Sequence, residues 1–127
     1  MKRIIIDTNG FLRLLLDDIP EQANQVEAVL KRANNGELEV FLPQIIVFEV
    51  VFALEKYYRL DKEEVIEKVE SLVSIGYIKV ESKEVFIQSL DLYKRSNISL
   101  VDCFLLSTAR GENMEFFTFD EKLKKLT

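Results

Sequence analysis

Short, continuously apolar runs along this chain alternate with longer segments in which apolar residues recur at helical spacing. The first run, Ile4–Ile6, is β-branched throughout, which is typical of a strand that helices cover on both faces of a parallel sheet. Three further runs predict strands over Glu39–Leu42, Tyr77–Val80 and Glu115–Phe119. The pattern therefore predicts four strands, the first of them fully buried.

Helical periodicity and capping residues predict helices in the intervals between these strands. The expected helices are Phe11–Asp17, Glu21–Asn34, Pro43–Arg59, Lys62–Ser74, Lys83–Ser96, Ser99–Arg110 and Glu121–Leu126. Regular alternation of strands and helices indicates an α/β fold, a parallel sheet with helices on both faces. Ligands of such sheets bind beyond the carboxyl ends of the strands, where Asp7 and Asp120 fall.

Composition is that of one globular domain. The 127 residues are 48% hydrophobic and 31% charged, with 4 Gly and 2 Pro, so we expect a single domain over residues 1–127 with a sizeable core. No apolar run reaches the roughly 18 residues of a membrane span, and the first residues do not resemble a signal peptide. A cytoplasmic protein without a membrane partner is expected, with the single Cys103 buried as a small hydrophobe.

Charge and the lack of histidine narrow the chemistry. The formal net charge of -5 argues against a general polyanion binder, so any nucleic-acid contact is expected at a local basic rim. The chain contains no histidine. It therefore cannot form a Ser-His-Asp or Cys-His catalytic arrangement, and it cannot bind zinc through histidine.

Four carboxylates lie in or beside apolar runs, where an isolated charge would be costly to bury: Asp7, Glu49, Asp102 and Asp120. Each has a separate structural explanation. Asp7 and Asp120 can cap helices, Asp102 lies where a helix dipole favours an acid, and Glu49 can lie on an exposed face or pair with a lysine. Taken together they indicate one site for a hard divalent cation, Mg²⁺ or Mn²⁺, with metal-activated water as the chemistry.

Other carboxylate-dependent α/β families each lack a required residue. A haloacid dehalogenase-type phosphatase needs Asp-x-Asp after its first strand, where Asn9 occupies the third position here. A receiver domain needs a phosphorylatable Asp after its third strand, and Glu81 is a poor substitute. No phosphate-binding loop of the Gly-x-x-x-x-Gly-Lys type is present.

An ordered set of short motifs extends over nearly the whole chain. The set consists of Ile5-Ile6-Asp7-Thr8-Asn9, Pro43-x5-Glu49, Asp102 with Ala109, and Thr118-Phe119-Asp120. In this order the chain resembles PIN-domain ribonucleases, particularly the VapC-type toxins of prokaryotic toxin–antitoxin pairs. The resemblance implies a three-layer α/β/α sandwich with a central parallel sheet of four or five strands. The family commonly has a further strand after the helix that begins at Glu121, and this sequence does not continue into one.

The resemblance also implies an activity, a Mg²⁺- or Mn²⁺-dependent endoribonuclease. Asp7 and Asp102 would be the main metal ligands, and Glu49 and Asp120 would complete the shell through bound waters or a second ion. Thr118 and Asn9 would support the site by hydrogen bonding.

Partners are implied in the same way: an RNA substrate, an antitoxin protein and a second copy in a homodimer. Basic residues that could line the rim of a shared groove are Arg13, Lys56, Arg59, Arg110 and Lys122. As single residues they are more commonly solvated surface charges. Two alternatives stay open: a housekeeping RNA-processing nuclease, and a non-catalytic PIN-like module that binds RNA or a protein.

Overall fold

The computed structural model describes residues 1–127, and the chain divides into two compact units, Met1–Glu81 and Ser82–Thr127. The first unit carries all the strands, and the second contains helices and loops alone. The expectation of a single domain over residues 1–127 stays a prediction.

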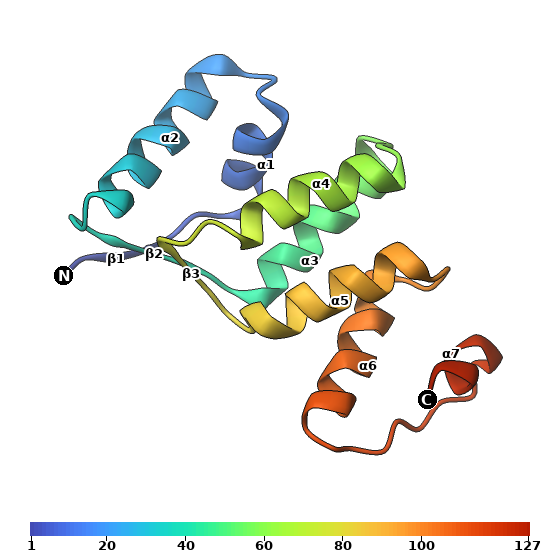
Figure 1. Cartoon of the computed structure of the whole chain (residues 1–127). Helices are drawn as coiled ribbons and strands as arrows, with labels where there is room; N and C mark the ends of the chain where they lie inside the picture. Colours follow the sequence, from blue (N-terminus) through green and yellow to red (C-terminus); the bar gives the residue numbers. More distant parts are fainter. The chain divides into compact units, whose positions relative to one another are not determined.

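The elements of the first unit follow the predicted ranges closely (Figure 1). In chain order they are β1 (Arg3–Ile5), α1 (Thr8–Leu16), α2 (Pro20–Asn34), β2 (Glu39–Leu42), α3 (Gln44–Phe52), η1 (Ala53–Tyr57), α4 (Lys62–Val73) and β3 (Ile78–Val80). Helix α1 begins earlier than expected, at Thr8, because Asp7 rather than a later residue caps it. Asp61 caps α4, since its side chain accepts the Glu64 N–H at 2.9 Å.

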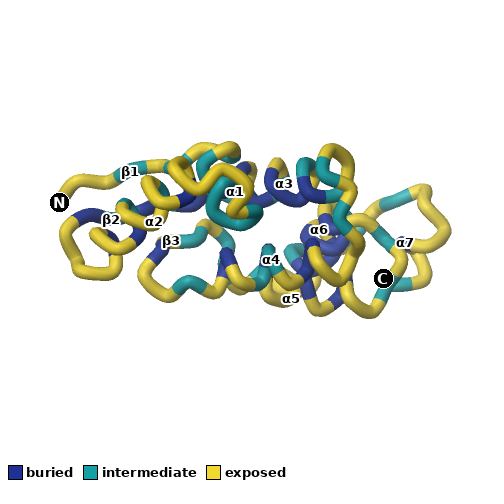
Figure 2. The backbone as a smooth tube through the Cα atoms, turned by 90° about the horizontal axis from the view of Figure 1, so that it is seen from above, coloured by how far each residue is buried: buried dark blue, intermediate teal, exposed yellow.

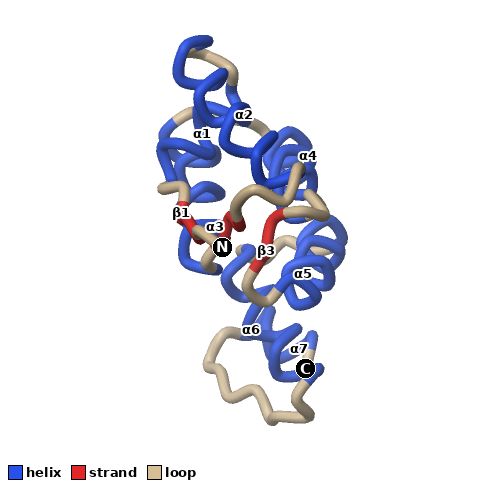
Figure 3. Tube along the Cα trace, turned by 90° about the vertical axis from the view of Figure 1, so that its left-hand side faces the viewer, coloured by secondary structure: helices blue, strands red, loops and turns tan.

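The sheet has the order β1-β2-β3, and both pairs of strands are parallel, as the alternation of strands and helices predicted. The strands are the short red segments in Figure 3. Ile4 lies opposite Val40, which in turn lies opposite Ile78. The central strand is the buried one, because Val40 and Leu42 are both 0% exposed. Strand β1 ends at Ile5 and β2 at Leu42. Because the strands are parallel, the segments that follow them leave the sheet at the same carboxyl end, where ligands of such sheets bind.

The prediction that the first strand is fully buried is wrong. Ile5 is 60% exposed and Ile4 is half-buried, whereas β2 contains fully buried residues (Figure 2). The reason is the position of β1 at the edge of the three-stranded sheet, where only one neighbouring strand pairs with it. A β-branched run predicts a strand, but it does not say whether the strand is central.

Helices of the first unit form its core around the sheet. Helix α1 packs against α2 and α3, and α3 packs against α4. Helix α4 contributes five buried apolar residues at helical spacing: Val65, Ile66, Val69, Leu72 and Val73. Phe11 of α1 is 0% exposed and is among the largest fully buried side chains.

The long helix predicted over Pro43–Arg59 is not a continuous α-helix. It begins as α3 and changes at Ala53 into the π-helical turn η1, in which the Tyr58 N–H donates to the Ala53 carbonyl at 2.9 Å. Arg59 then has a φ of 55°, in the left-handed region, and ends the helix.

The second unit consists of α5 (Lys83–Arg95), α6 (Leu100–Gly111) and α7 (Glu121–Leu126). Helices α5 and α6 pack together, with the rings of Phe86 and Phe104 4.9 Å apart between centroids. Cys103 is buried among them, as predicted. In neither unit does a helix have both the length and the apolar content that a membrane span needs.

The strand predicted over Glu115–Phe119 is absent from the structure, and residues 114–118 have no regular secondary structure. A strand needs a neighbouring backbone to accept and donate hydrogen bonds, and the second unit contains no other strand. The observed sheet therefore has three strands, and a count of four or five stays a prediction.

Candidate active site

Asp7 lies directly beyond β1 and caps helix α1. Its backbone is extended (φ -74°, ψ 175°), and its Oδ1 accepts the Gly10 N–H at 2.9 Å. The carboxylate is exposed, and Oδ2 takes no part in the cap. The capping explanation is thus correct for Asp7, and it leaves one carboxylate oxygen available to a ligand.

Gly10 is a part of this turn that sequence reasoning missed. A Cβ at this position would lie far inside van der Waals contact with Ile6 Cγ2, which a branched side chain cannot relieve by swinging away. The N–H of Gly10 also donates to Asp7. A glycine directly before the predicted helix Phe11–Asp17 was the available signal, because an isolated glycine next to a helical pattern commonly has a packing reason.

Glu49 of α3 is joined to the residue that follows Asp7. Thr8 Oγ1 donates to Glu49 Oε1 at 2.9 Å, a bond between residues 41 positions apart in the chain. The packing of α1 on α3 makes this bond, and so brings the Asp7-Thr8 turn and Glu49 to the same part of the first unit. The role of Thr8 was also missed, since no spacing rule pairs positions so far apart.

The premise that the four carboxylates occupy costly buried positions is wrong. Asp7, Glu49 and Asp120 are exposed, and Asp102 is half-buried. Helix α3 explains the error: its buried side holds Ile46, Val47, Val50 and Val51. Its other side exposes Ile45 (62%) and Phe52 (64%) together with Glu49. The apolar residues around Glu49 therefore lie on both the buried and the exposed faces of the helix.

A groove lies beside Asp7 between α1 and α2. Its volume is about 400 Å³, and its lining includes Asp7, Asn9, Gly10, Gln22 and Gln25. Asn9 therefore shares a concave surface with Asp7, as a supporting residue would have to, although no hydrogen bond joins the two side chains.

In the second unit, Asp102 lies in the first turn of α6 and Asp120 caps α7. The Asp102 N–H donates to Ser99 Oγ at 3.1 Å, and the Asp102 carboxylate makes no hydrogen bond. Asp120 Oδ1 accepts the N–H groups of Lys122 and Leu123 at 2.8 and 3.1 Å. Thr118 Oγ1 accepts the Asp120 N–H at 3.0 Å, so Thr118 shapes the turn that presents this aspartate.

Neither unit by itself gathers three His, Cys, Asp or Glu side chains into a group that could hold a metal ion. Asp7 and Glu49 come from the first unit, and Asp102 and Asp120 from the second. Each of the four keeps at least one carboxylate oxygen outside the hydrogen bonds described above. Oxygen donors of this kind suit Mg²⁺ or Mn²⁺. The chemistry of these oxygen donors therefore fits a hard cation. That the four carboxylates form one site stays a prediction.

Arg13 is not the solvated rim residue that the sequence suggested. Its side chain is 14% exposed, its Nη2 donates to the Tyr58 hydroxyl at 2.6 Å, and its Nε lies 3.4 Å from Asp18 Oδ1. Arg13 therefore connects α1 to Tyr58 at the end of η1, and its role is structural. Lys56 and Arg59 are exposed and have no hydrogen-bond or ion-pair partner.

The other two basic candidates lie in the second unit. Arg110 is exposed and donates to the Leu126 carbonyl, so part of its guanidinium ties α6 to α7. The Lys122 side chain is exposed at the start of α7.

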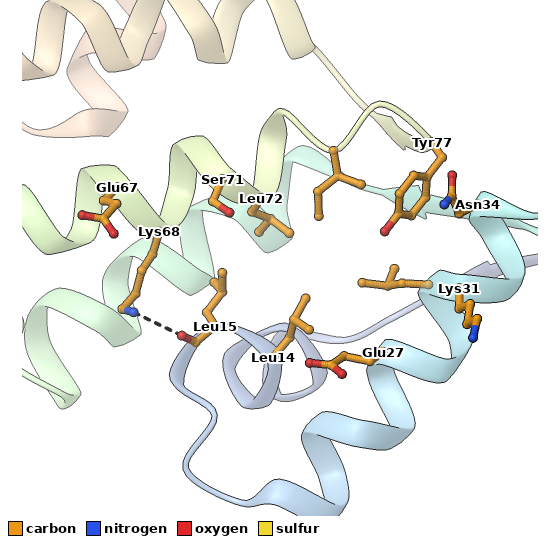
Figure 4. A pocket seen from close by; sticks show the side chains of 12 residues that line it. Leu14, Leu15, Glu27, Lys31, Asn34, Glu67, Lys68, Ser71, Leu72 and Tyr77 are labelled. Carbon is orange, nitrogen blue, oxygen red and sulfur yellow. Dashed lines mark hydrogen bonds between the residues drawn. The ribbon is translucent and has the colours of Figure 1, made fainter.

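A larger hollow of about 590 Å³ is lined by residues of α1, α2 and α4 and by the segment leading to β3 (Figure 4). Leu14, Leu15 and Leu72 contribute apolar surface, and Lys68 Nζ donates to the Leu15 carbonyl at 3.1 Å. Its lining contains none of the four candidate carboxylates.

Comparisons with known proteins agree with the motif order. The model of the PIN domain family matches residues 4–127. A protein named VapC ribonuclease from Aquifex aeolicus (strain VF5) is 25% identical over 125 residues, which cover 96% of this chain and 90% of that protein.

Proposed function

Because this chain belongs to the PIN-domain family, we propose that it is an endoribonuclease that hydrolyses RNA phosphodiester bonds with Mg²⁺ or Mn²⁺. The name of the relative from Aquifex aeolicus, a ribonuclease, supports RNA as the substrate. The chain covers most of that protein, so the similarity is not limited to one motif.

The observation that carries this proposal is the hydrogen bond from Thr8, the residue that follows Asp7, to Glu49 in the first unit. This bond joins the turn that contains Asp7 to Glu49, and both carboxylates are exposed with one oxygen outside these hydrogen bonds. A bound Mg²⁺ or Mn²⁺ supplies an activated water for in-line attack on phosphorus and offsets charge on the phosphate oxygens. Asp7 and Asp102 would hold the ion, and Glu49 and Asp120 would orient its waters or hold a second ion.

This proposal requires both units to act as one domain over residues 1–127, with the four carboxylates at a common site. Thr118 would keep Asp120 in place through its bond to the Asp120 N–H, and Asn9 would hydrogen-bond bound water or phosphate beside Asp7. A joint site also accounts for the exposure of Asp7, Glu49 and Asp120, because ligand-binding carboxylates must be reachable.

We propose further that Glu115–Phe119 forms a fourth strand of the parallel sheet. Ile5 is 60% exposed, and Phe117 and Phe119 are 81% and 83% exposed, so both segments present apolar surface without cover. Backbone nuclear Overhauser contacts between residues 115–119 and a strand of the sheet would be expected, and their absence would leave the sheet at three strands.

The toxin role would add two partners. An antitoxin peptide would bind in the groove beside Asp7 and insert an Arg among the carboxylates, where a bidentate guanidinium–carboxylate pair is strong. A second copy would form a homodimer. A neighbouring short reading frame that encodes a DNA-binding protein would favour the toxin over a housekeeping nuclease, and co-purification of the two products would test the pair.

The decisive experiment is cleavage of a labelled structured RNA with and without Mn²⁺. Wild-type protein should cut only with the ion, and Asp7→Asn and Asp102→Asn should each abolish cutting. Asp17→Asn is the matched control, because Asp17 is an exposed acid at the other end of α1 with a φ of 50°, which Asn also tolerates. Cleavage that survives both substitutions would refute the proposal.

A second candidate, a non-catalytic PIN-like module, is favoured by one observation. Asp7 and Asp120 both serve as helix caps, so their presence has a structural reason without catalysis. Failure of the wild-type protein to bind Mn²⁺ at all would support this module.

A further inference from the structure

Two Asn-Gly steps of the first unit lie in different settings. Asn9-Gly10 belongs to α1, whereas Asn35-Gly36 directly follows the last residue of α2. Asparagine before glycine is the pair most prone to deamidation, because glycine has no side chain to hinder attack of its backbone nitrogen on the preceding carboxamide. The folded backbone then decides which of the two steps can react.

Asn35-Gly36 lies in an exposed turn at the end of α2. All residues from Asn34 to Glu37 are exposed, Gly36 has a φ of 80°, and no atom lies within 4 Å of the place that a Cβ of this glycine would take. The Gly36 N–H donates to the Ala33 carbonyl at 3.1 Å, in the turn that ends the helix. Helix ends fray at low cost in free energy, and fraying of residues 34–37 uncovers no buried side chain among them. The Gly36 nitrogen is therefore freed often.

Asn9-Gly10, by contrast, is protected by the fold. The Gly10 N–H donates to Asp7 Oδ1 at 2.9 Å within the first turn of α1. The next two residues, Phe11 and Leu12, are 0% and 3% exposed, so opening the backbone at Gly10 would disturb the core. The same dipeptide is thus held in α1 and accessible after α2.

Charged groups surround the Asn35 side chain. Its Nδ2 donates to Glu37 Oε2 at 3.5 Å, and Glu37 Oε1 lies 3.5 Å from Arg32 Nε. A carboxylate at position 35 would repel Glu37 instead of donating to it, and it would lie at the negative end of the α2 dipole. Asn34 and Lys31, at the same end of α2, line the hollow between α1, α2 and α4 (Figure 4). A new charge at position 35 would therefore weaken a turn that borders this hollow.

We propose that Asn35 is a site of spontaneous deamidation, a modification separate from the proposed nuclease function. The Gly36 backbone nitrogen bonds to Asn35 Cγ, the bond from Cγ to the side-chain nitrogen breaks, and ammonia leaves with the proton of the Gly36 N–H. Water then opens the succinimide ring at either of its carbonyls, which gives aspartate or isoaspartate at position 35. The reaction needs no oxidant, metal or enzyme, so the product accumulates as the protein ages and adds a negative charge to the chain.

The test is ageing of the purified full chain at mildly alkaline pH, followed by digestion with pepsin at acidic pH and mass spectrometry of the peptides. The peptide that contains Asn35 should gain about one dalton, and its amide should disappear at least about tenfold faster than that of Asn9. Fragment spectra separate Asn35 from Asn34. In urea, which removes the protection given by the fold, the Asn9 and Asn35 amides should disappear at similar rates.

Asn35→Gln should abolish the mass gain of the folded protein. Asn24→Gln, which alters an exposed asparagine of α2 that does not precede a glycine, is the matched control and should keep it. On anion exchange, aged wild type should develop a more acidic form that co-elutes with Asn35→Asp. Loss of the Asn9 and Asn35 amides at equal rates in the folded protein would overturn the inference, as would a mass gain that persists in Asn35→Gln. Neither result depends on RNA cleavage, so failure of the nuclease proposal would leave this inference intact.

Discussion

At the scale of single residues, the hydroxyl of Thr8 is the link between two candidate ligands. Thr8→Val keeps the shape of the side chain but removes the 2.9 Å donor to Glu49, which frees that carboxylate to rotate. We expect Thr8→Val to weaken Mn²⁺ binding by at least about tenfold, because a hydrogen bond to a charged group contributes roughly 1.5–3 kcal/mol, and Thr8→Ser to bind like wild type. Isothermal titration with Mn²⁺ measures this directly. Equal affinities for the Val and Ser variants would show that Thr8 does not position Glu49.

Gly10 makes a second residue-scale prediction. Gly10→Ala would force its new methyl group against Ile6 and shift the turn that holds Asp7. We expect a loss of about 1–3 kcal/mol in the free energy of unfolding, the usual cost of overpacking. Urea denaturation measures it. Gly76→Ala is the control, because no atom lies near its new Cβ, and a loss of equal size there would remove the steric explanation.

At the scale of elements, the N-terminus of α3 depends on a residue from the end of β3. Pro43 offers no side-chain cap, and the Gln44 N–H donates instead to Glu81 Oε1 at 2.9 Å. We expect Glu81→Ala to lower the free energy of unfolding by about 1 kcal/mol and Glu81→Gln, which keeps an acceptor, to lower it less.

Chemical denaturation of both variants tests the cap. Glu27→Ala, which removes an exposed acid from the middle of α2, should leave stability nearly unchanged and controls for the loss of charge. If Glu81→Ala were as stable as wild type, α3 would not need this distant acceptor.

At the scale of the whole molecule, a common metal site predicts a linkage between ion and folding. Carboxylates brought together without a cation repel one another, so an ion that binds the folded chain should raise its melting temperature. Saturation to about 100 times Kd would add about 2.7 kcal/mol to the free energy of unfolding. Differential scanning calorimetry with and without Mn²⁺ measures the shift.

Asp7→Asn should remove most of that shift, and Asp17→Asn should keep it. A shift that is equal in wild type and Asp7→Asn would place the bound ion elsewhere. No shift at millimolar Mn²⁺ would count against any formed site.

The sequence by itself determined what depends on neighbouring residues. The helix caps at Asp61 and Ser99 and the apolar spacing along α4 depend on side chains within a few positions of one another, and the parallel sheet follows from the alternation of strands and helices. Hydrophobic periodicity and helix capping are local properties, so the sequence reveals them without knowledge of which distant segments pack together. The four candidate carboxylates were likewise recognisable from motif order.

Only the tertiary structure decided which distant groups meet and which face of an element is covered. The Thr8–Glu49 and Gln44–Glu81 bonds join residues 41 and 37 positions apart, and no local pattern encodes them. The apolar runs at Ile4–Ile6 and around Glu49 could not show that β1 is an edge strand or that Glu49 is exposed. Burial is a property of the packed chain, because it depends on which segments fold over a residue as well as on the residue itself.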